Sequence, residues 1–335
     1  MSLQLSDILA ARCAIAGVAV RTPFVASPFL SARLGDDFLL KLETTQPIGA
    51  FKLRGAVNAI TTLDPNIAGV TCCSTGNHGR GVAYAARARG LRAVVCMSSL
   101  VPPAKVDGIR ALGAEVRIVG RSQDDALAES QRLAREDNLA EISPFDNASV
   151  IAGQGTIGLE MLEDRPDLAA ILVPLSGGGL AAGVALGAKA IKPDIKVIGV
   201  SMDRGAAMHA SIRAGHPVEV EEVASLADSL GGGIGRDNRL SFPLCRALLD
   251  DVILVTEADI YRAMQALYYE DRMVAEGASV VGIAALLEGK LPAFGGTVGT
   301  IITGRNVDMR VFTDIVAGRD VDLDGMVLKG HAHAA

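Results

Sequence analysis

The sequence predicts an α/β fold built on two mostly parallel sheets. Short apolar runs alternate with helix-length segments along most of the 335 residues, and this alternation is typical of sheets flanked by helices. The apolar runs are continuous rather than alternating, which is the pattern of parallel strands covered on both faces. Apolar residues make up 50% of the chain and charged residues 21%, a balance that can fill a sizeable core.

Strands are predicted wherever a short apolar run is bounded by polar or turn-forming residues. In chain order these are Phe38–Leu42, Val70–Cys73, Arg92–Met97, Glu115–Val119, Ile171–Leu175, Lys196–Val200, Ile253–Val255 and Thr297–Thr303. Helices are predicted in the longer segments between them, namely Gly79–Arg89, Pro103–Leu112, Ser122–Asp137, Gly153–Glu163 and Glu257–Glu276. This order of strands and helices supports the α/β class.

The spacing of the strands also predicts how the chain divides into domains. The closely spaced strands between Val70 and Val119 should form a compact small domain, which we place at residues 68–146. Residues 1–67 and 147–330 should form a larger domain around the second sheet. The last residues, 331–335, are small and polar and should form a flexible tail.

The composition argues against several classes of partner. A net charge of −6, no Trp and only 4% aromatic residues do not predict a nucleic-acid surface. Leu168–Ala188 is uncharged, but Pro174 and a run of glycines interrupt it, so we expect a buried strand, loop and helix rather than a membrane span. The first residues do not resemble a signal peptide, so a cytoplasmic protein is expected. The cysteines form no CxxC pair, so neither a disulfide framework nor a zinc site is predicted.

Lys52 is the first candidate for chemistry. It lies in the apolar segment Gly49–Ala56 at the apparent start of a helix. Desolvation and the positive end of a helix dipole both disfavour an ammonium group, so the Lys52 amine could be nucleophilic near neutral pH. An isolated Lys of this kind more often extends from a buried helix to solvent; the flanking Phe51 and Arg54-Gly55 favour a functional role.

Two loops between a strand and a helix are the next candidates. Ser74–Gly79 presents backbone N–H groups at a predicted helix start, which suits a carboxylate, although a plain helix cap explains the same residues equally well. Ser176–Leu180 contains three consecutive glycines, which allow the backbone to approach a phosphate closely. The second loop matches neither GxGxxG nor the Walker pattern, so alone it is a weak indication.

The order of these segments carries more information than any one of them. Together they resemble the serine/threonine dehydratase and serine racemase family of fold-type II enzymes, which depend on pyridoxal phosphate. The matching segments, which run from Arg21 to Asp308, are Arg21-Thr22-Pro23, Lys41-Leu42-Glu43, Gln46, Phe51-Lys52-Leu53-Arg54-Gly55-Ala56, Ser74-Thr75-Gly76-Asn77-His78, Gly113-Ala114-Glu115-Val116, Pro144-Phe145-Asp146, Gly153-Gln154-Gly155-Thr156, Ser176-Gly177-Gly178-Gly179-Leu180 and Thr303-Gly304-Arg305-Asn306. The segments Ile48-Gly49-Ala50-Phe51-Lys52 and Thr303-Gly304-Arg305-Asn306-Val307-Asp308 also look like the dehydratases assigned to hydroxyectoine utilisation.

The resemblance implies a two-domain fold like that of the tryptophan synthase β subunit, with the cofactor in the cleft between mostly parallel sheets. It also implies a role for each matched residue: a Schiff base with the cofactor for Lys52, packing beside the pyridine ring for Phe51, a hydrogen bond to the ring hydroxyl for Asn77, phosphate binding for Ser176, Gly177, Gly178, Gly179 and Leu180, a hydroxyl at the ring nitrogen for Thr303, and the substrate carboxylate pocket for Ser74, Thr75, Gly76 and His78.

The activity implied is the loss of water and ammonia from a small β-hydroxy amino acid to give a 2-oxo acid. Thr75 stands where racemases of the family carry a catalytic Ser, so an amino-acid racemase or a β-replacement enzyme remains an alternative, as does an inactive ligand-binding homologue. Ser201 replaces the acidic residue of the metal-binding members, so no metal is expected. Arg305 replaces a Gly and could reach an acidic or larger substrate, although a solvated surface Arg explains the residue equally well. A homodimer is also expected from the family.

Overall fold

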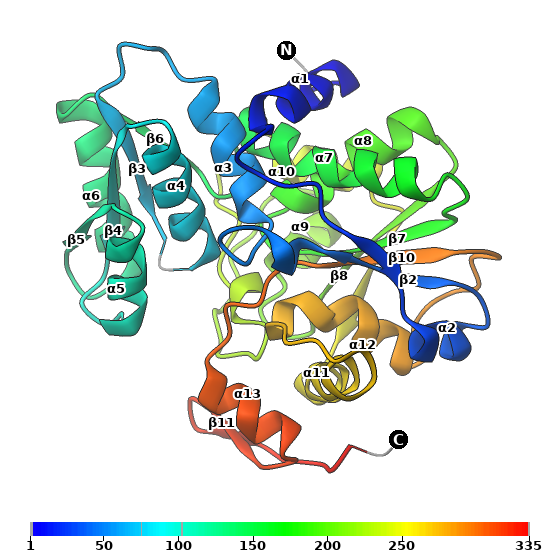
Figure 1. Ribbon diagram of the computed structural model, residues 1–335. Helices are drawn as coiled ribbons and strands as arrows, with labels where there is room; N and C mark the ends of the chain where they lie inside the picture. Colours follow the sequence, from blue (N-terminus) through cyan, green and yellow to red (C-terminus); the bar gives the residue numbers. More distant parts are fainter. Residues whose placement is uncertain (1–2, 75, 102, 334–335) are drawn as a thin grey trace.

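A computed structural model describes residues 3–74, 76–101 and 103–333, and it contains two sheets flanked by helices (Figure 1). The larger sheet has six strands in the order β1-β2-β10-β7-β8-β9. Its strands are β1 (Phe24–Ala26), β2 (Phe38–Leu42), β7 (Ala170–Pro174), β8 (Lys196–Met202), β9 (Asp251–Val255) and β10 (Val298–Ile302). All neighbouring strands pair in parallel except β1, which pairs antiparallel with β2 at one edge.

Helices cover both faces of the larger sheet (Figure 1). One face packs under α7 (Ala148–Asp164), α8 (Gly179–Ile191), α9 (Ala207–Ala214) and α10 (Ser241–Leu248), and α1 (Leu5–Ile15) packs in turn on α7 and α8. The other face packs on α2 (Pro28–Leu34), α11 (Glu257–Asp271) and α12 (Val281–Leu287). Successive residues of a strand point to opposite faces, so Ile171 lies in the core on the α7 side while Leu172 lies in the core on the α11 side. Strands buried on both faces explain why the apolar runs are continuous in the sequence.

The smaller sheet has four parallel strands in the order β5-β4-β3-β6. Its strands are β3 (Gly69–Cys73), β4 (Arg92–Met97), β5 (Glu115–Ile118) and β6 (Leu139–Glu141), and its helices are α4 (Asn77–Ala88), α5 (Pro103–Ala111) and α6 (Gln123–Glu136). Helix α3 (Lys52–Thr61) precedes this sheet in the chain but packs against both α4 and α7. It therefore joins the core of the smaller sheet to the helices of the larger one.

The remaining elements are short. They are three 3-10 helices, η1 (Glu43–Thr45), η2 (Asp228–Leu230) and η3 (Gly277–Val280), then helix α13 (Met309–Val316) and a hairpin of β11 (Val321–Leu323) and β12 (Met326–Leu328). The described part of the predicted tail is held in place rather than free: the His333 ring stacks on Tyr269, and its Nε2 lies 2.8 Å from Glu270 Oε1. These contacts are with the last turn of α11.

The predicted α/β class is confirmed, and each predicted strand is present within three residues of its expected limits. The prediction of a helix over Glu257–Glu276 was wrong at its end. The helix stops at Asp271 because Arg272 takes a left-handed conformation with φ 58°, which an L-residue cannot continue into a helix. The domain limits at residues 68 and 146 stay a prediction. Within the described residues, no helix is long and apolar enough to cross a membrane.

A buried group of ions ties α3 to the larger sheet. The Arg54 guanidinium, which is fully buried, lies 2.8 Å from Glu43 Oε1 and 2.6 Å from Glu160 Oε1. Lys41 Nζ lies 2.6 Å from the other oxygen of Glu160 and donates a hydrogen bond to the carbonyl of Thr22. Two cations and two carboxylates therefore balance in a region without solvent, and they connect α3, β2, η1 and α7.

We expect Arg54→Met to lower the free energy of unfolding by about 3–5 kcal/mol, because it leaves two buried carboxylates facing one cation. Denaturant unfolding of the full-length protein measures this change. The matched control is Arg21→Met, since Arg21 pairs with Glu163 and Asp164 while its side chain stays 49% exposed. That change should cost about 1 kcal/mol or less. Equal losses of unfolding free energy in the two variants would show that the buried ion group contributes no more to stability than the exposed ion pair.

Candidate active site

The site begins where parallel strands end. Strands β7 and β10 are neighbours in the larger sheet, so the loop after Pro174 and the residue Thr303 after β10 emerge at the same edge. In open α/β sheets, ligands bind at the carboxyl ends of the strands. The loop after β3, which begins at Ser74, leaves the smaller sheet in the same way.

Lys52 is placed at this edge by contacts of the chain on either side of it. The N–H of Phe51 donates to the Thr303 carbonyl at 2.9 Å, and Ala50 pairs with Gly304 as an isolated antiparallel bridge. Helix α3 then begins at Lys52, and its amine donates to the carbonyl of Pro144 at 2.8 Å. The first turn of α3 thus lies directly against the end of β10.

The electrostatics of the site favour a neutral amine. Desolvation lowers the pKa of Lys52 to about 8, and the opposing effect of the Glu276 charge is smaller. The amine lies 5.3 Å from the centre of the Phe51 ring. A Lys with such a pKa is partly unprotonated near neutral pH and can attack a carbonyl carbon.

The glycine loop follows β7 and opens helix α8. Gly178 has φ 89°, and a Cβ on it would come within 2.6 Å of the Met208 methyl and 2.9 Å of the Cys245 sulfur. A Cβ on Gly177 would lie 2.3 Å from the Phe145 ring. Because the first N–H groups of a helix have no partner within it, this closely packed turn presents donors to an anion.

Asn77 joins the loop after β3 to the larger sheet. Its Nδ2 donates to both oxygens of Glu276, at 2.9 and 3.0 Å, and its Oδ1 accepts from Asn306 at 2.6 Å. Glu276 is buried, and burial raises its pKa to about 7 against the opposing hydrogen bond from Asn77. An uncharged side-chain amide is thus held in one orientation between the two sheets.

His78 lies next to this group with its ring buried. Its Nε2 is 2.7 Å from the carbonyl of Ile142, so Nε2 carries the proton and Nδ1 is an acceptor that has no partner among the described residues. Desolvation, followed by the charge of Lys52, lowers the pKa of His78 to about 3. The ring is therefore neutral at physiological pH.

Thr303 is buried at the end of β10, and its hydroxyl lies 2.9 Å from that of Ser279. The Ser279 hydroxyl also bonds to the backbone of Gly304, accepting from its N–H and donating to its carbonyl, both at 2.8 Å. Since that hydroxyl has one proton, which goes to the Gly304 carbonyl, the proton between Thr303 and Ser279 comes from Thr303 in this arrangement.

Most of the residues predicted from the sequence converge on this region, with two exceptions. Thr75 lies outside the described residues. Arg305 is exposed, and its aliphatic chain lies against Gly49, with Cγ 3.2 Å from the position of a Cβ there. Its guanidinium has no hydrogen bond or ion pair within the described part of the chain, and whether it reaches a substrate stays a prediction.

Sequence reasoning missed two members of the site, Glu276 and Ser279. Glu276 stood at the end of a predicted helix and was given no role. One signal was available: Glu276 is followed by Gly277–Leu287, which contains no charged residue, so the carboxylate enters an apolar part of the chain. Ser279 carried no signal, because a single Ser in an apolar segment is common.

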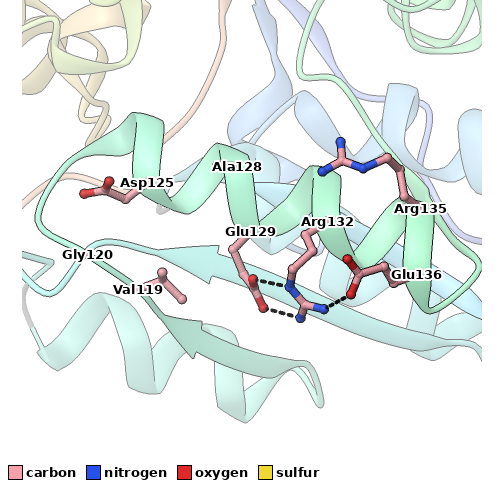
Figure 2. Close-up of a pocket in the computed structure, with 8 residues that line it drawn as sticks. All are labelled: Val119, Gly120, Asp125, Ala128, Glu129, Arg132, Arg135 and Glu136. Carbon is pink, nitrogen blue, oxygen red and sulfur yellow. Dashed lines mark hydrogen bonds and ion pairs between the residues drawn. The ribbon is translucent and has the colours of Figure 1, made fainter.

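Other features of the surface are poorer candidates. A hollow on α6 is lined by Val119, Gly120, Asp125, Ala128, Glu129, Arg132, Arg135 and Glu136 (Figure 2). Arg132 there is already paired with Glu129 and Glu136, at 2.8 and 2.6 Å. Among the described residues, no group of three or more His, Cys, Asp or Glu side chains could hold a metal ion.

Comparison with known proteins identifies the family of the chain. Residues 15–304 match the model of the pyridoxal-phosphate dependent enzymes. A putative threonine dehydratase of Sinorhizobium fredii is 54% identical over 95% of this chain and 96% of its own length. An L-threonine ammonia-lyase of Thermotoga maritima is 37% identical over 97% of this chain and 82% of its own. The solved structure of maize serine racemase superimposes with a TM-score of 0.88 at 34% identity, covering 94% of this chain and 97% of that one. With its Lys at the start of α3 and its glycine loop at the start of α8, this chain belongs to the family of pyridoxal-phosphate-dependent enzymes.

Proposed function

We propose that this enzyme removes water and ammonia from a small β-hydroxy amino acid, such as serine, threonine or a relative of them, and releases a 2-oxo acid. The observation that carries the proposal is the environment of the Lys52 amine. The amine is buried at the start of α3 and donates a hydrogen bond to the carbonyl of Pro144. The names of the two most similar relatives quoted above, a threonine dehydratase and a threonine ammonia-lyase, support this class of reaction.

The residues around Lys52 fit the cofactor. The backbone N–H groups from Ser176 to Leu180 would hold the phosphate at the start of α8. Phe51 would pack beside the ring, and Thr303 would place its hydroxyl at the ring nitrogen. Asn77 would donate to the ring hydroxyl.

Bound pyridoxal phosphate supplies an electron sink for the bond that breaks at the substrate α-carbon. The N–H groups of Ser74, Gly76 and His78 would bind the substrate carboxylate at the start of α4, where the helix dipole favours an anion. Thr75 is assigned to the same pocket from the sequence. The Lys52 amine would accept the α-proton of the substrate on Nζ as the general base. To donate to the ring nitrogen, the Thr303 hydroxyl would turn its proton away from Ser279. A ring nitrogen held by such a donor would carry no proton, and this would favour rapid loss of the β-hydroxyl.

A second candidate function is racemisation, because maize serine racemase is the structural neighbour with 34% identity described above. The two activities are separated by incubating the protein with L-serine, L-threonine and 3-hydroxyaspartate. Release of ammonia and a 2-oxo acid supports the first proposal, and inversion of configuration without ammonia overturns it. We also propose that the enzyme is a homodimer, with residues 68–146 as its small domain, which gel filtration and limited proteolysis can test.

Replacing Lys52 should abolish the reaction. Lys52→Ala removes both the attachment point and the general base, so kcat/KM for ammonia release should fall by at least about 10²–10⁴-fold, and the visible absorption of the bound cofactor should be lost. Lys329→Ala is the control, because the Lys329 side chain is 75% exposed. Ammonia release at the wild-type rate by Lys52→Ala would contradict the assignment.

The rate at which Lys52 reacts with the cofactor should rise with pH. Only the neutral amine attacks the aldehyde of the cofactor, and the pKa of Lys52 is about 8. In cofactor-stripped protein, the rate at which the visible band returns should rise with pH up to about pH 8 and then level off. A rate that falls between pH 6 and pH 8 would contradict a neutral-amine mechanism.

Gly178→Ala should weaken cofactor binding. The new Cβ meets Met208 and Cys245, and φ 89° disfavours any L-side chain, so the loop must shift. We expect a loss of affinity of about tenfold, which corresponds to roughly 1.4 kcal/mol, measured by fluorescence titration with pyridoxal phosphate. The control is Gly295→Ala, which has φ 70° but no atom within 4 Å of the added Cβ. The affinity of this variant for the cofactor should stay unchanged. Its positive φ should lower only the free energy of unfolding.

A further inference from the structure

Glu276 is a buried carboxylate whose surroundings connect it to two parts of the site. It belongs to the segment between α11 and η3, and its N–H donates to the carbonyl of Gly304 at 3.1 Å. A side chain at position 304 would collide with it, because a Cβ there lies 2.6 Å from Glu276 Oε1. Helix α11 ends before Glu276, at Arg272, and the missing side chain at position 304 leaves room for the carboxylate.

The contact with Asn77 fixes how that amide is oriented. The two oxygens of one carboxylate are too close together to receive the two diverging N–H bonds of an amide. Glu276 therefore takes a single N–H of Asn77 on both of its oxygens, at 2.9 and 3.0 Å. Asn306 occupies the Oδ1 of Asn77. The second N–H of Asn77 is left as a donor for another group.

The same residue lies close to the segment that carries Lys52, because the N–H of Glu276 donates to the carbonyl of Gly304 and Gly304 pairs with Ala50, two residues before Lys52. The negative charge of Glu276 favours the ammonium form of Lys52 and opposes the desolvation of the amine. The groups that face Glu276 are Asn77 and Lys52 on the side of α3 and α4, Asp228 and Ser229 from η2, and the backbone of Gly304 and Asn306. Asp228 is the second acid of this set, and its charge disfavours the ionised form of Glu276.

We propose that Glu276 is a positioning residue of this enzyme, which orients Asn77 so that the amide donates to the ring hydroxyl of the cofactor and which places a negative charge near the Lys52 amine. The proposal rests on the function proposed above, because it takes Lys52 and Asn77 as groups that contact the cofactor. Glu276 acts through these two residues and is not itself assigned a contact with substrate.

Two substitutions separate the roles of Glu276. Glu276→Gln keeps an acceptor oxygen for Asn77 and removes the charge, whereas Glu276→Asp keeps the charge and withdraws the acceptor by one methylene. Glu257→Gln is the matched control, since Glu257 is 5% exposed and its contact is with the N–H of Leu226, away from Lys52. Circular dichroism and thermal unfolding confirm that each full-length variant is folded.

The first readout is the pH midpoint of Lys52 labelling by an amine-reactive reagent in cofactor-stripped protein, followed by mass spectrometry of the Lys52 peptide. Glu276→Gln should lower this midpoint by about one unit, because a nearby opposite charge typically shifts a pKa by one unit or more. Glu276→Asp and Glu257→Gln should leave the midpoint within a few tenths of a unit of the wild-type value. An unchanged midpoint in Glu276→Gln overturns the electrostatic role.

The second readout is the affinity for pyridoxal phosphate, measured by fluorescence titration. Glu276→Asp should bind it about tenfold more weakly, because Asn77 loses its anchor, whereas Glu276→Gln should stay within about threefold of the wild type. Wild-type affinity in Glu276→Asp overturns the positioning role, and this holds even if Glu276→Gln does not fold. A failure of the proposed function looks different, since the wild-type enzyme would then release no ammonia from any substrate tested while both binding readouts could still be measured.

Discussion

The buried guanidinium of Arg54 is the contact on which the geometry of the site depends. It fills the space between two carboxylates that come from η1 and α7, and it lies two residues beyond Lys52 in the first turn of α3. A helix that is held by ions in a dry region has little freedom to rotate or slide, because any displacement leaves a charge without its partner. Because Lys52 is in the same turn of α3, its backbone is held in place as well.

Burial determines the chemistry of the site more than direct pairing does. Lys52, His78 and Glu276 are all displaced from their usual pKa toward the neutral form, and desolvation is the largest cause for each of them. The result is a region in which burial shifts an amine, an imidazole and a carboxyl group toward their uncharged forms. Such a region strengthens the few charges that remain, since the local dielectric is low.

The α/β fold was predictable from the sequence, because the continuous apolar runs are a local signal of buried parallel strands. The roles of Asn77, Ser176 and Thr303 were predicted from the resemblance to the family, since each of their loops alone was ambiguous. Glu276 was not predicted, because the helical pattern of α11 continues in the sequence beyond the point where Arg272 ends the helix. The Arg54 group was not predicted either, since its partners lie 11 and 106 positions away in the chain and contacts of that kind have no local signature.

The hydrogen bond from Lys52 to Pro144 connects the amine to a distant part of the chain. Asp146, two residues after Pro144, accepts N–H bonds from Arg239, Leu240 and Ser241 at the start of α10. The segment that receives the amine is therefore anchored on the helices of the larger sheet. A substitution that displaced the start of α10 could thus shift the Lys52 amine through Asp146 and Pro144, although it would lie far from Lys52 in the sequence.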